Sequence, residues 1–448
     1  MHTFDPQMTD LVLGYVRNRL AMAEAPLDHP GHAADLAQAL TGVITDEGRD
    51  ASEVLEIYAT RLAPHVISAD SPRFMSFIPS APTKAALLFD TVVSCASLQG
   101  ISWLEAAGAV AAENQVLRVL SDLAGLPASA GGTFVSGGSA GNLSALVVAR
   151  ETARRRLGDP RARLRVAVSG QAHSSIANSL RMLDLEALVI PTLDRRLNEE
   201  AVRAAFDVDG HSQDVCAIVA TAGTTNAGII DDLAGVAAAI KGRDIWFHVD
   251  AAYGGAGLLA ASVRSRYDGI EHADSLVIDP HKWLFAPFDC AALLYREPSL
   301  AKAVHTQDAP YLDSIHGDDP DEWNPTDYAY HLTRRARGLP LWFSMAVNGL
   351  DAYRDAVEAA IELTRTTVEL VHERPYLTLL REPELSNVIF RREGWGADEY
   401  GRWSTDLLER QRAFVQPTRW DGELVGRLSF LHPATTVEMV VEVLDAMA

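Results

Sequence analysis

The chain has 448 residues, which is more than one domain of about 100–200 residues usually holds, so two or three units are expected. Its 60 acidic residues outnumber its 39 basic ones and give a formal net charge of −21, which argues against a nucleic-acid or anionic-membrane partner. With 48% hydrophobic and 22% charged residues, the composition is that of a globular protein.

The first 60 residues are predicted to form helices. Apolar residues recur at helical spacing in residues 8–23 and again in 51–66, before a proline-rich break at 68–84. Such a helical arm is too small to enclose a hydrophobic core of its own. We therefore expect it to pack on a partner subunit or on the main body.

Residues 110–300 alternate between short apolar runs and helix-like stretches, two of which are 140–157 and 231–242. The apolar runs lack a clear two-residue alternation, which is typical of strands buried on both faces of a mostly parallel sheet. They are residues 163–169, 215–221, 244–250, 275–279 and 290–295. The pattern predicts a doubly wound α/β domain, in which ligands bind beyond the carboxyl ends of the strands.

The last part of the chain is predicted to form a smaller α+β unit. Residues 337–374 have the pattern of one long helix or two, and strand-like segments follow at 386–392 and 426–432. We therefore divide the chain into an N-terminal helical arm, a large ligand-binding domain and a small C-terminal domain. Their ranges are 1–60, 61–340 and 341–448.

The cysteines and the N-terminus indicate the compartment. Cys95, Cys216 and Cys290 stand apart in apolar surroundings, which suits buried thiols better than a disulfide framework or a zinc site. The N-terminus lacks the basic-then-apolar pattern of a secretory signal, and no unbroken apolar stretch of about 18 residues occurs. We expect a cytoplasmic protein with no bound metal and no membrane partner.

One of the four lysines in the sequence stands out by its surroundings. Lys282 lies in SLVIDPHKWLF, between an apolar strand and further apolar residues, where a buried ammonium tends to lose its proton. Two interpretations are open. Lys282 either pairs with a carboxylate such as Asp279 or Asp289, or forms an imine with a carbonyl cofactor.

Small residues at 137–141 precede a helical run in SGGSAGNLSALVVAR. Backbone N–H groups there can close on a phosphate at the positive end of the helix dipole. The segment is neither GxGxxG nor GxxxxGK[ST], so it disfavours a dinucleotide or a nucleoside triphosphate. The alternative is a glycine-rich turn that close packing alone requires.

Three more polar side chains follow strand ends. Asp250 ends the apolar run DIWFHVD before the small residue Ala252, and a buried aspartate needs a cationic partner such as a pyridinium nitrogen. His173, in QAHSSIAN, could stack on a flat ring, although a lone loop histidine is more often merely hydrogen-bonded. Thr225 follows another strand, in ATAGTTNAG. A phosphate cradle, a stacking ring, a carboxylate and an imine-capable lysine are together what pyridoxal phosphate (PLP) requires.

The sequence resembles the group II PLP-dependent decarboxylases, which include aromatic-L-amino-acid, histidine and glutamate decarboxylases. The matching segments occur in family order through most of the first 345 residues. They are SPRFMSFIPS, GISWLEAAG, SGGSAGN, AHSSIANS, ATAGTTNAG, DIWFHVDAAYGG, IDPHKWLFAPFDC and DAPYLD. The resemblance implies fold type I, the aspartate-aminotransferase-like fold. This fold has a mostly parallel seven-stranded sheet in a large PLP-binding domain and a smaller α+β C-terminal domain.

The resemblance also implies which residues carry the chemistry. Lys282 would bind PLP covalently, with His281 beside it. Asp250 would keep the pyridine nitrogen protonated, so that the ring accepts electrons. In this family a tyrosine on a mobile loop returns the proton after CO2 has left, and Tyr311 in the polar stretch TQDAPYLDSIHGDDPDEW aligns with it. An ordinary surface loop with one anchoring aromatic residue is the alternative for that stretch.

The other matching residues would hold the cofactor in place. His173 would stack on the ring and Ala252 would pack on its opposite face. Gly138 and Ser139 would bind the phosphate, and Thr225 would lie near the cofactor. One position departs from the pattern, because Asp279 stands where asparagine is common.

The implied reaction is decarboxylation of an L-amino acid to the amine and CO2, with a homodimer whose subunits share the active site. The substrate pocket would include Phe77, Ile78, Pro79, Ser80 and Trp103. This largely apolar set slightly favours an aromatic or apolar substrate. The alternatives are decarboxylation-dependent oxidative deamination, which yields an aldehyde, and a catalytically silent homologue.

Overall fold

The computed structural model describes residues 2–78, 80–208, 212–315, 319 and 322–448. These residues form two compact units. The first comprises residues 1–79, 366–381 and 389–448, and the second comprises 80–365 and 382–388. The three-part division made from the sequence remains a prediction.

Within the described residues, the second unit contains a seven-stranded sheet of order β1-β7-β6-β5-β4-β2-β3. Its strands are β1 (Gly131–Val135), β2 (Arg165–Ser169), β3 (Glu186–Ile190), β4 (Val215–Thr221), β5 (Trp246–Asp250), β6 (Ser275–Ile278) and β7 (Ala291–Tyr295). The pairs among β3, β2, β4, β5 and β6 are parallel, whereas β7 is antiparallel to both β6 and β1. The predicted fold class is confirmed.

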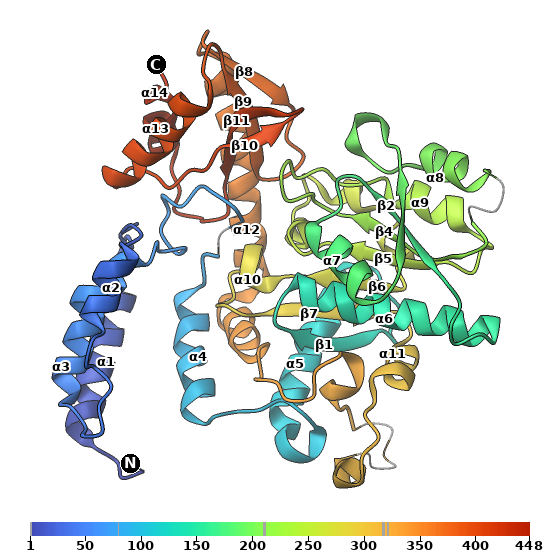
Figure 1. Ribbon diagram of the computed structural model, residues 1–448, viewed down its shortest axis with the longest axis horizontal. Helices are drawn as coiled ribbons and strands as arrows, with labels where there is room; N and C mark the ends of the chain where they lie inside the picture. The colour runs from blue at the N-terminus through green and yellow to red at the C-terminus, as the bar shows by residue number, and fades with distance from the viewer. Residues whose placement is uncertain (1, 79, 209–211, 316–318, 320–321) are drawn as a thin grey trace. The chain divides into compact units, whose positions relative to one another are not determined.

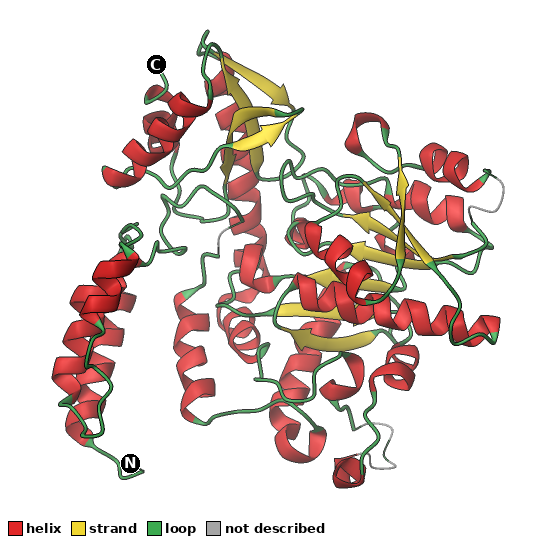
Figure 2. Ribbon diagram, viewed as in Figure 1, coloured by secondary structure: helices red, strands yellow, loops and turns green. Residues whose placement is uncertain are grey.

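The second unit also contains helices (Figure 2). They are α4 (Lys84–Cys95), α5 (Trp103–Leu123), α6 (Gly138–Leu157), α7 (Ser174–Met182), α8 (Glu199–Phe206), α9 (Leu233–Ile240), α10 (Pro280–Trp283), α11 (Pro298–His305) and most of α12 (Leu339–His372). Short 3-10 segments lie at Leu193–Arg195, Gly254–Leu259, Arg264–Tyr267, Ile270–His272, Pro310–Ile315 and Pro325–Tyr328. The α/β alternation expected from the sequence is present.

Helix α6 packs across the sheet and contacts β1 and β4–β7 (Figure 1). Its buried residues, among them Leu146 and Val148, join a core with Val166 of β2, Val219 of β4 and Leu293 of β7. The burial of each large aliphatic side chain contributes about 1.5–3 kcal/mol to the stability of the fold. This core therefore holds α6 in place on the sheet. The N-terminus of α6 is thereby held at the carboxyl ends of the strands.

The first unit contains the remaining elements. Its helices are α1 (Pro6–Ala21), α2 (Ala33–Ala39), α3 (Ala51–Ile57), α13 (Ala397–Glu409) and α14 (Val437–Asp445), with a π-helical turn at Tyr58–Leu62 and a 3-10 turn at Ala63–His65. Within its described residues, a four-stranded sheet has the order β10-β11-β9-β8, with β8 (Leu377–Arg381), β9 (Asn387–Arg392), β10 (Thr418–Trp420) and β11 (Glu423–Ser429). The helices expected at 8–23 and 51–66 correspond to α1 and α3.

Two details refine the expectations from the sequence. Cys216 and Cys290 are buried thiols, but Cys95 is exposed, because the C-terminal turn of α4 leaves it on the solvent side. No helix in the described ranges combines the length and apolarity that a bilayer crossing demands.

Candidate active site

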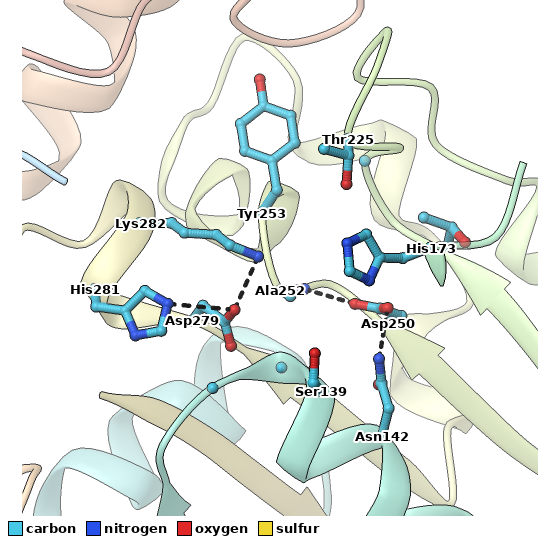
Figure 3. Close-up of a pocket in the computed structure, with 14 residues that line it drawn as sticks. Ser139, Asn142, His173, Thr225, Asp250, Ala252, Tyr253, Asp279, His281 and Lys282 are labelled. Atoms are coloured by element: carbon cyan, nitrogen blue, oxygen red, sulfur yellow. Dashed lines mark hydrogen bonds and ion pairs between the residues drawn. The ribbon is translucent and has the colours of Figure 1, made fainter. Parts of the chain in front are cut away.

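The carboxyl ends of the central strands surround a pocket of about 270 Å³ in the second unit (Figure 3). Asp250 ends β5 and Thr221 ends β4, while Lys282 follows β6 and the start of α6 follows β1. The lining residues are Gly137, Gly138, Ser139, Asn142, His173, Thr221, Gly223, Thr225, Asp250, Ala252, Tyr253, Asp279, His281 and Lys282. All the residues that the sequence assigned to cofactor binding therefore line one pocket.

Lys282 lies in α10, a single turn that begins at Pro280 directly after β6. Its Nζ is 2.8 Å from Oδ2 of the buried Asp279. Burial by itself lowers the pKa of Lys282, but the charge and hydrogen bond of Asp279 outweigh it and leave the pKa above its ordinary value. Of the two carboxylates considered from the sequence, Asp279 pairs with Lys282, whereas Asp289 pairs with Arg337.

His281 is held beside this ion pair. Its Nδ1 accepts the backbone N–H of Cys290 at 3.0 Å, so its ring proton lies on Nε2, which is 3.6 Å from Asp279 Oδ2. Burial lowers the pKa of His281, and the charge of Asp279 only partly opposes that effect. The arrangement gives Asp279 two basic neighbours, and its Oδ1 has no hydrogen-bond partner among the described residues.

Asp250 lines the pocket and is 5% exposed. Its Oδ1 accepts the N–H of Ala252 at 3.1 Å, and its Oδ2 accepts Nδ2–H of Asn142 at 2.9 Å. Both oxygens of the carboxylate therefore accept a hydrogen bond. A buried carboxylate held in this way can stabilise a cationic ring nitrogen.

Helix α6 contributes the cradle expected from the sequence. A Cβ on Gly138 would lie 2.9 Å from the Cβ of Ala252 and 3.0 Å from Oδ2 of Asp279, so only glycine fits this approach. No side chain among the described residues caps the N-terminus of α6, and Ser139 points into the pocket from its first turn (Figure 3). The positive end of this 20-residue helix therefore opens toward the pocket.

His173 and Thr225 come from two other strand ends. His173 is the N-cap residue of α7, and its Nδ1 accepts the backbone N–H of Ser175 at 3.2 Å. Its exposed ring stands beside Asp250 in Figure 3. Thr225 is also exposed and follows β4, and its carbonyl accepts Nδ2–H of Asn387 at 3.2 Å.

Four lining residues were not among the candidates chosen from the sequence, namely Asn142, Thr221, Gly223 and Tyr253. Asn142 lies one turn after Gly138 on α6, a spacing that places both on one helix face and could have identified it. Tyr253 is buried, its ring stacks on Trp283 with centroids 5.6 Å apart, and its hydroxyl accepts the N–H of Ser386 at 3.0 Å. No signal in the sequence links Tyr253 to residue 386.

Other predicted site residues do not line this pocket. Tyr311 lies in the 3-10 segment Pro310–Ile315 and is 72% exposed. The hydroxyl of the buried Ser80 donates to the carbonyl of Ala286 at 3.0 Å, and the N–H of Trp103 donates to Asn324 at 2.8 Å. Phe77 and Ile78 belong to the first unit, and Pro79 lies outside the described residues. The roles assigned to all of them remain predictions.

Comparison with known proteins agrees with this geometry. A family model described as the pyridoxal-dependent decarboxylase conserved domain matches residues 34–393. The chain belongs to this family. It is 33% identical to L-2,4-diaminobutyrate decarboxylase of Rhizobium meliloti (strain 1021) over 86% of this chain and 78% of that protein. It is 27% identical to aromatic-L-amino-acid decarboxylase of Bacillus atrophaeus over 98% and 92% of the two chains.

Solved structures share the fold of this pyridoxal-dependent decarboxylase. The crystal structure of Oryza sativa TDC with PLP and tryptamine superposes with a TM-score of 0.92 at 23% identity, covering 99% of this chain and 98% of that one. Mouse CSAD superposes with a TM-score of 0.87 at 24% identity, covering 98% of each chain. At these identities the likeness concerns the fold alone.

The pocket fits the cofactor of the family, pyridoxal 5'-phosphate. The primary amine of Lys282 can react with an aldehyde, and the buried Asp250 carboxylate suits a pyridinium nitrogen. The cradle at Gly138, which a Cβ would fill, and the open N-terminus of α6 suit a phosphate. The protein is a PLP-dependent carboxy-lyase.

Proposed function

We propose that this decarboxylase converts an L-amino acid with an aromatic or apolar side chain to the amine and CO2. The observation that carries the proposal is the meeting of Lys282, Asp250 and the α6 cradle in one pocket. These groups provide covalent attachment, a counter-charge for the ring and a phosphate site within a single space. Relatives that act on aromatic amino acids, including the Bacillus atrophaeus enzyme, support the choice of substrate.

Each of these side chains would have a separate role in the decarboxylation. Bound PLP supplies an electron sink for the electron pair that the departing carboxylate leaves on Cα. Asp250 holds a proton at the ring nitrogen, and His173 orients the ring. Lys282 would be the point of covalent attachment for PLP when no substrate is bound. Tyr311, or a water that it orients, returns a proton to Cα.

Two other reactions have support among relatives. The 33% identical relative acts on 2,4-diaminobutyrate, which has a basic side chain. The Aedes aegypti relative, 25% identical over 95% of this chain, is a 3,4-dihydroxyphenylacetaldehyde synthase. The presence of both His173 and Tyr311 favours amine formation over the aldehyde.

A substrate panel tests the proposal. The purified protein with PLP is incubated in air with the common L-amino acids and L-2,4-diaminobutyrate, and the products are identified by mass. An amine from an aromatic or apolar member is the expected result. 1,3-Diaminopropane as the dominant product would replace the proposed substrate class, and an aldehyde with ammonia would replace the reaction.

The Tyr311→Phe variant tests the proton donor. We expect amine formation to fall by at least about 100-fold, because general acid catalysis typically contributes a factor of 10²–10⁴, while PLP binding stays intact. Aldehyde should appear as a new product. Unchanged amine output would remove Tyr311 from the mechanism.

We further propose that the enzyme acts in the cytoplasm as a homodimer with a shared active site. The exposed Tyr311 and the predicted pocket residues outside the PLP pocket support this, because they would need other chain segments to complete a site. Light scattering of the purified protein should give twice the 48.5 kDa of one chain. A monomer with full activity would contradict the proposal.

A further inference from the structure

Buried polar groups form a chain of hydrogen bonds that ends at Asp250. His248 precedes Asp250 by two residues on β5 and pairs in register with Ser275 of β6. Trp246 Nε1 donates to Ser275 Oγ at 2.7 Å, and Ser275 Oγ is 2.8 Å from His248 Nδ1. His248 Nε2 is 2.8 Å from Oδ1 of Asn142, whose Nδ2 is 2.9 Å from Asp250 Oδ2. The chain thus joins two strands and α6 to the carboxylate.

The donors in this chain can point in one direction only. The Asp250 carboxylate accepts, so Asn142 must turn its NH2 toward Asp250 and its oxygen toward His248. That oxygen also only accepts, so the proton of His248 lies on Nε2. Burial lowers the pKa of His248 to about 4, so the ring is neutral at pH 7 and its Nδ1 accepts from the Ser275 hydroxyl. Reversing the amide would place its oxygen against the carboxylate.

The same amide reaches the stacking histidine. The second N–H of Asn142 Nδ2 donates to Ser175 Oγ at 3.0 Å, and the Ser175 hydroxyl is 2.8 Å from His173 Nδ1. The backbone N–H of Ser175 donates to His173 Nδ1 at 3.2 Å, so this nitrogen carries no proton and the Ser175 hydroxyl can only donate to it. The ring proton of His173 therefore lies on Nε2.

We propose that Asn142 and His248 are positioning residues that keep Asp250 ionised and, through Ser175, fix the proton of His173 on Nε2. The inference rests on the proposed function, because it assigns Asp250 to the ring nitrogen and His173 to the ring face. One network then holds the charge of Asp250 at the ring nitrogen of the cofactor and the tautomer of His173 at the ring face. Neither residue needs to react.

Four variants test this. Asn142→Leu and His248→Leu remove the chain, and His248→Gln keeps one donor and one acceptor on its terminal amide. His305→Leu is the matched control, because His305 is also buried but donates to the Ser144 carbonyl at 3.1 Å. For each variant we would measure the Kd for PLP, the pH midpoint of the visible absorbance band of the loaded protein, and Tm.

Asn142→Leu and His248→Leu should weaken PLP binding by roughly tenfold, since each loses support for a charged group. Their absorbance midpoint should move to higher pH, because a weaker counter-charge leaves less positive charge in the ring to oppose protonation of the imine nitrogen. His248→Gln should restore both values, and His305→Leu should change neither. If His248→Leu does not fold, the PLP Kd and the absorbance midpoint of Asn142→Leu and His248→Gln still test the proposal.

A folded Asn142→Leu protein with the parent's Kd and midpoint would overturn the inference while leaving the proposed function intact. A parent protein that binds no PLP and shows no visible band would instead overturn the proposed function, and the inference with it.

Discussion

Asp279 is the residue that most affects the state of Lys282. Its Oδ2 lies 2.8 Å from Lys282 Nζ and within 3.0 Å of the position that a Cβ on Gly138 would take. The same carboxylate therefore raises the pKa of Lys282 and places a negative charge beside Gly138, where we propose that the phosphate binds. Both effects oppose capture of an anionic aldehyde by a neutral amine.

An Asp279→Asn protein should capture PLP faster near neutral pH. The amide keeps the shape of the carboxylate but removes the charge, so the pKa of Lys282 falls and neutral amine is present at lower pH. Stopped-flow absorbance after mixing apoprotein with PLP, repeated over a pH series, measures the change. The midpoint of the rate–pH profile should move to lower pH.

Asp289→Asn is the control for that series, because Asp289 pairs with Arg337 rather than with Lys282. Its profile should overlay that of the parent. An Asp279→Asn profile with an unshifted midpoint would show that the ion pair does not govern the lysine.

At the residue scale, the sequence was sufficient for side chains that carry their own chemical signature. Lys282 in an apolar segment, Asp250 at a strand end and the small residues at 137–141 each left a purely structural alternative open, and only their combination indicated a cofactor site before any fold was known. Asn142 and His248 had no such signature, because their roles depend on the register that sets His248 opposite Ser275. Strand register is a tertiary property, so the hydrogen-bonded chain could not be derived from local patterns.

At the scale of elements, burial decided which strands were predictable. Strands β4, β5 and β6 are buried throughout and gave continuous apolar runs. The edge strand β3 is largely exposed, and β1 begins with two glycines, so neither produced that pattern. The antiparallel direction of β7 was also not predicted, since a two-faced apolar run does not reveal strand direction.

Helix α12 shows a break that the sequence left open as one helix or two. Gly349 has φ 75° and ψ 158°, a region that only glycine adopts readily, and a Cβ there would meet nothing within 4 Å. Gly349→Ala should therefore lower the free energy of unfolding by about 1–3 kcal/mol through backbone strain alone. Urea unfolding followed by circular dichroism measures this loss.

Gly401→Ala provides the comparison for Gly349→Ala. Gly401 lies within α13, is exposed, and also has open space where a Cβ would be added, but its φ is not positive. Alanine there should raise the free energy of unfolding by about 0.5–1 kcal/mol, because glycine weakens a helix interior. A gain in stability from both substitutions would contradict strain at Gly349.

At the scale of the whole molecule, neutral histidines that are buried or half-buried should make the fold sensitive to acid. Burial lowers the pKa of His248, His305 and His331 to about 4 in each case, below the ordinary value of about 6.5. The unfolded chain then binds more protons than the folded one between those values. Their contribution to stability is complete above pH 6.5 and is lost as the pH falls toward 4.

His305→Gln isolates one of these contributions, because glutamine can still donate to the Ser144 carbonyl. Between pH 7 and pH 5 the parent should lose about 2 kcal/mol more stability than the variant. Urea midpoints at the two pH values give the difference. The exposed His272 supplies the control, and His272→Gln should leave the parent's loss unchanged. A His305→Gln protein that loses as much stability as the parent would contradict a neutral buried His305.

The central claim is that Lys282 attaches the cofactor within the pocket at the strand ends. The most direct test is to load the protein with PLP, reduce it with borohydride, and locate the pyridoxyl group by peptide mass mapping. We predict one modified peptide, containing Lys282, and no stable modification in a Lys282→Ala protein. A pyridoxyl group on Lys84, Lys241 or Lys302 in place of Lys282 would contradict the account.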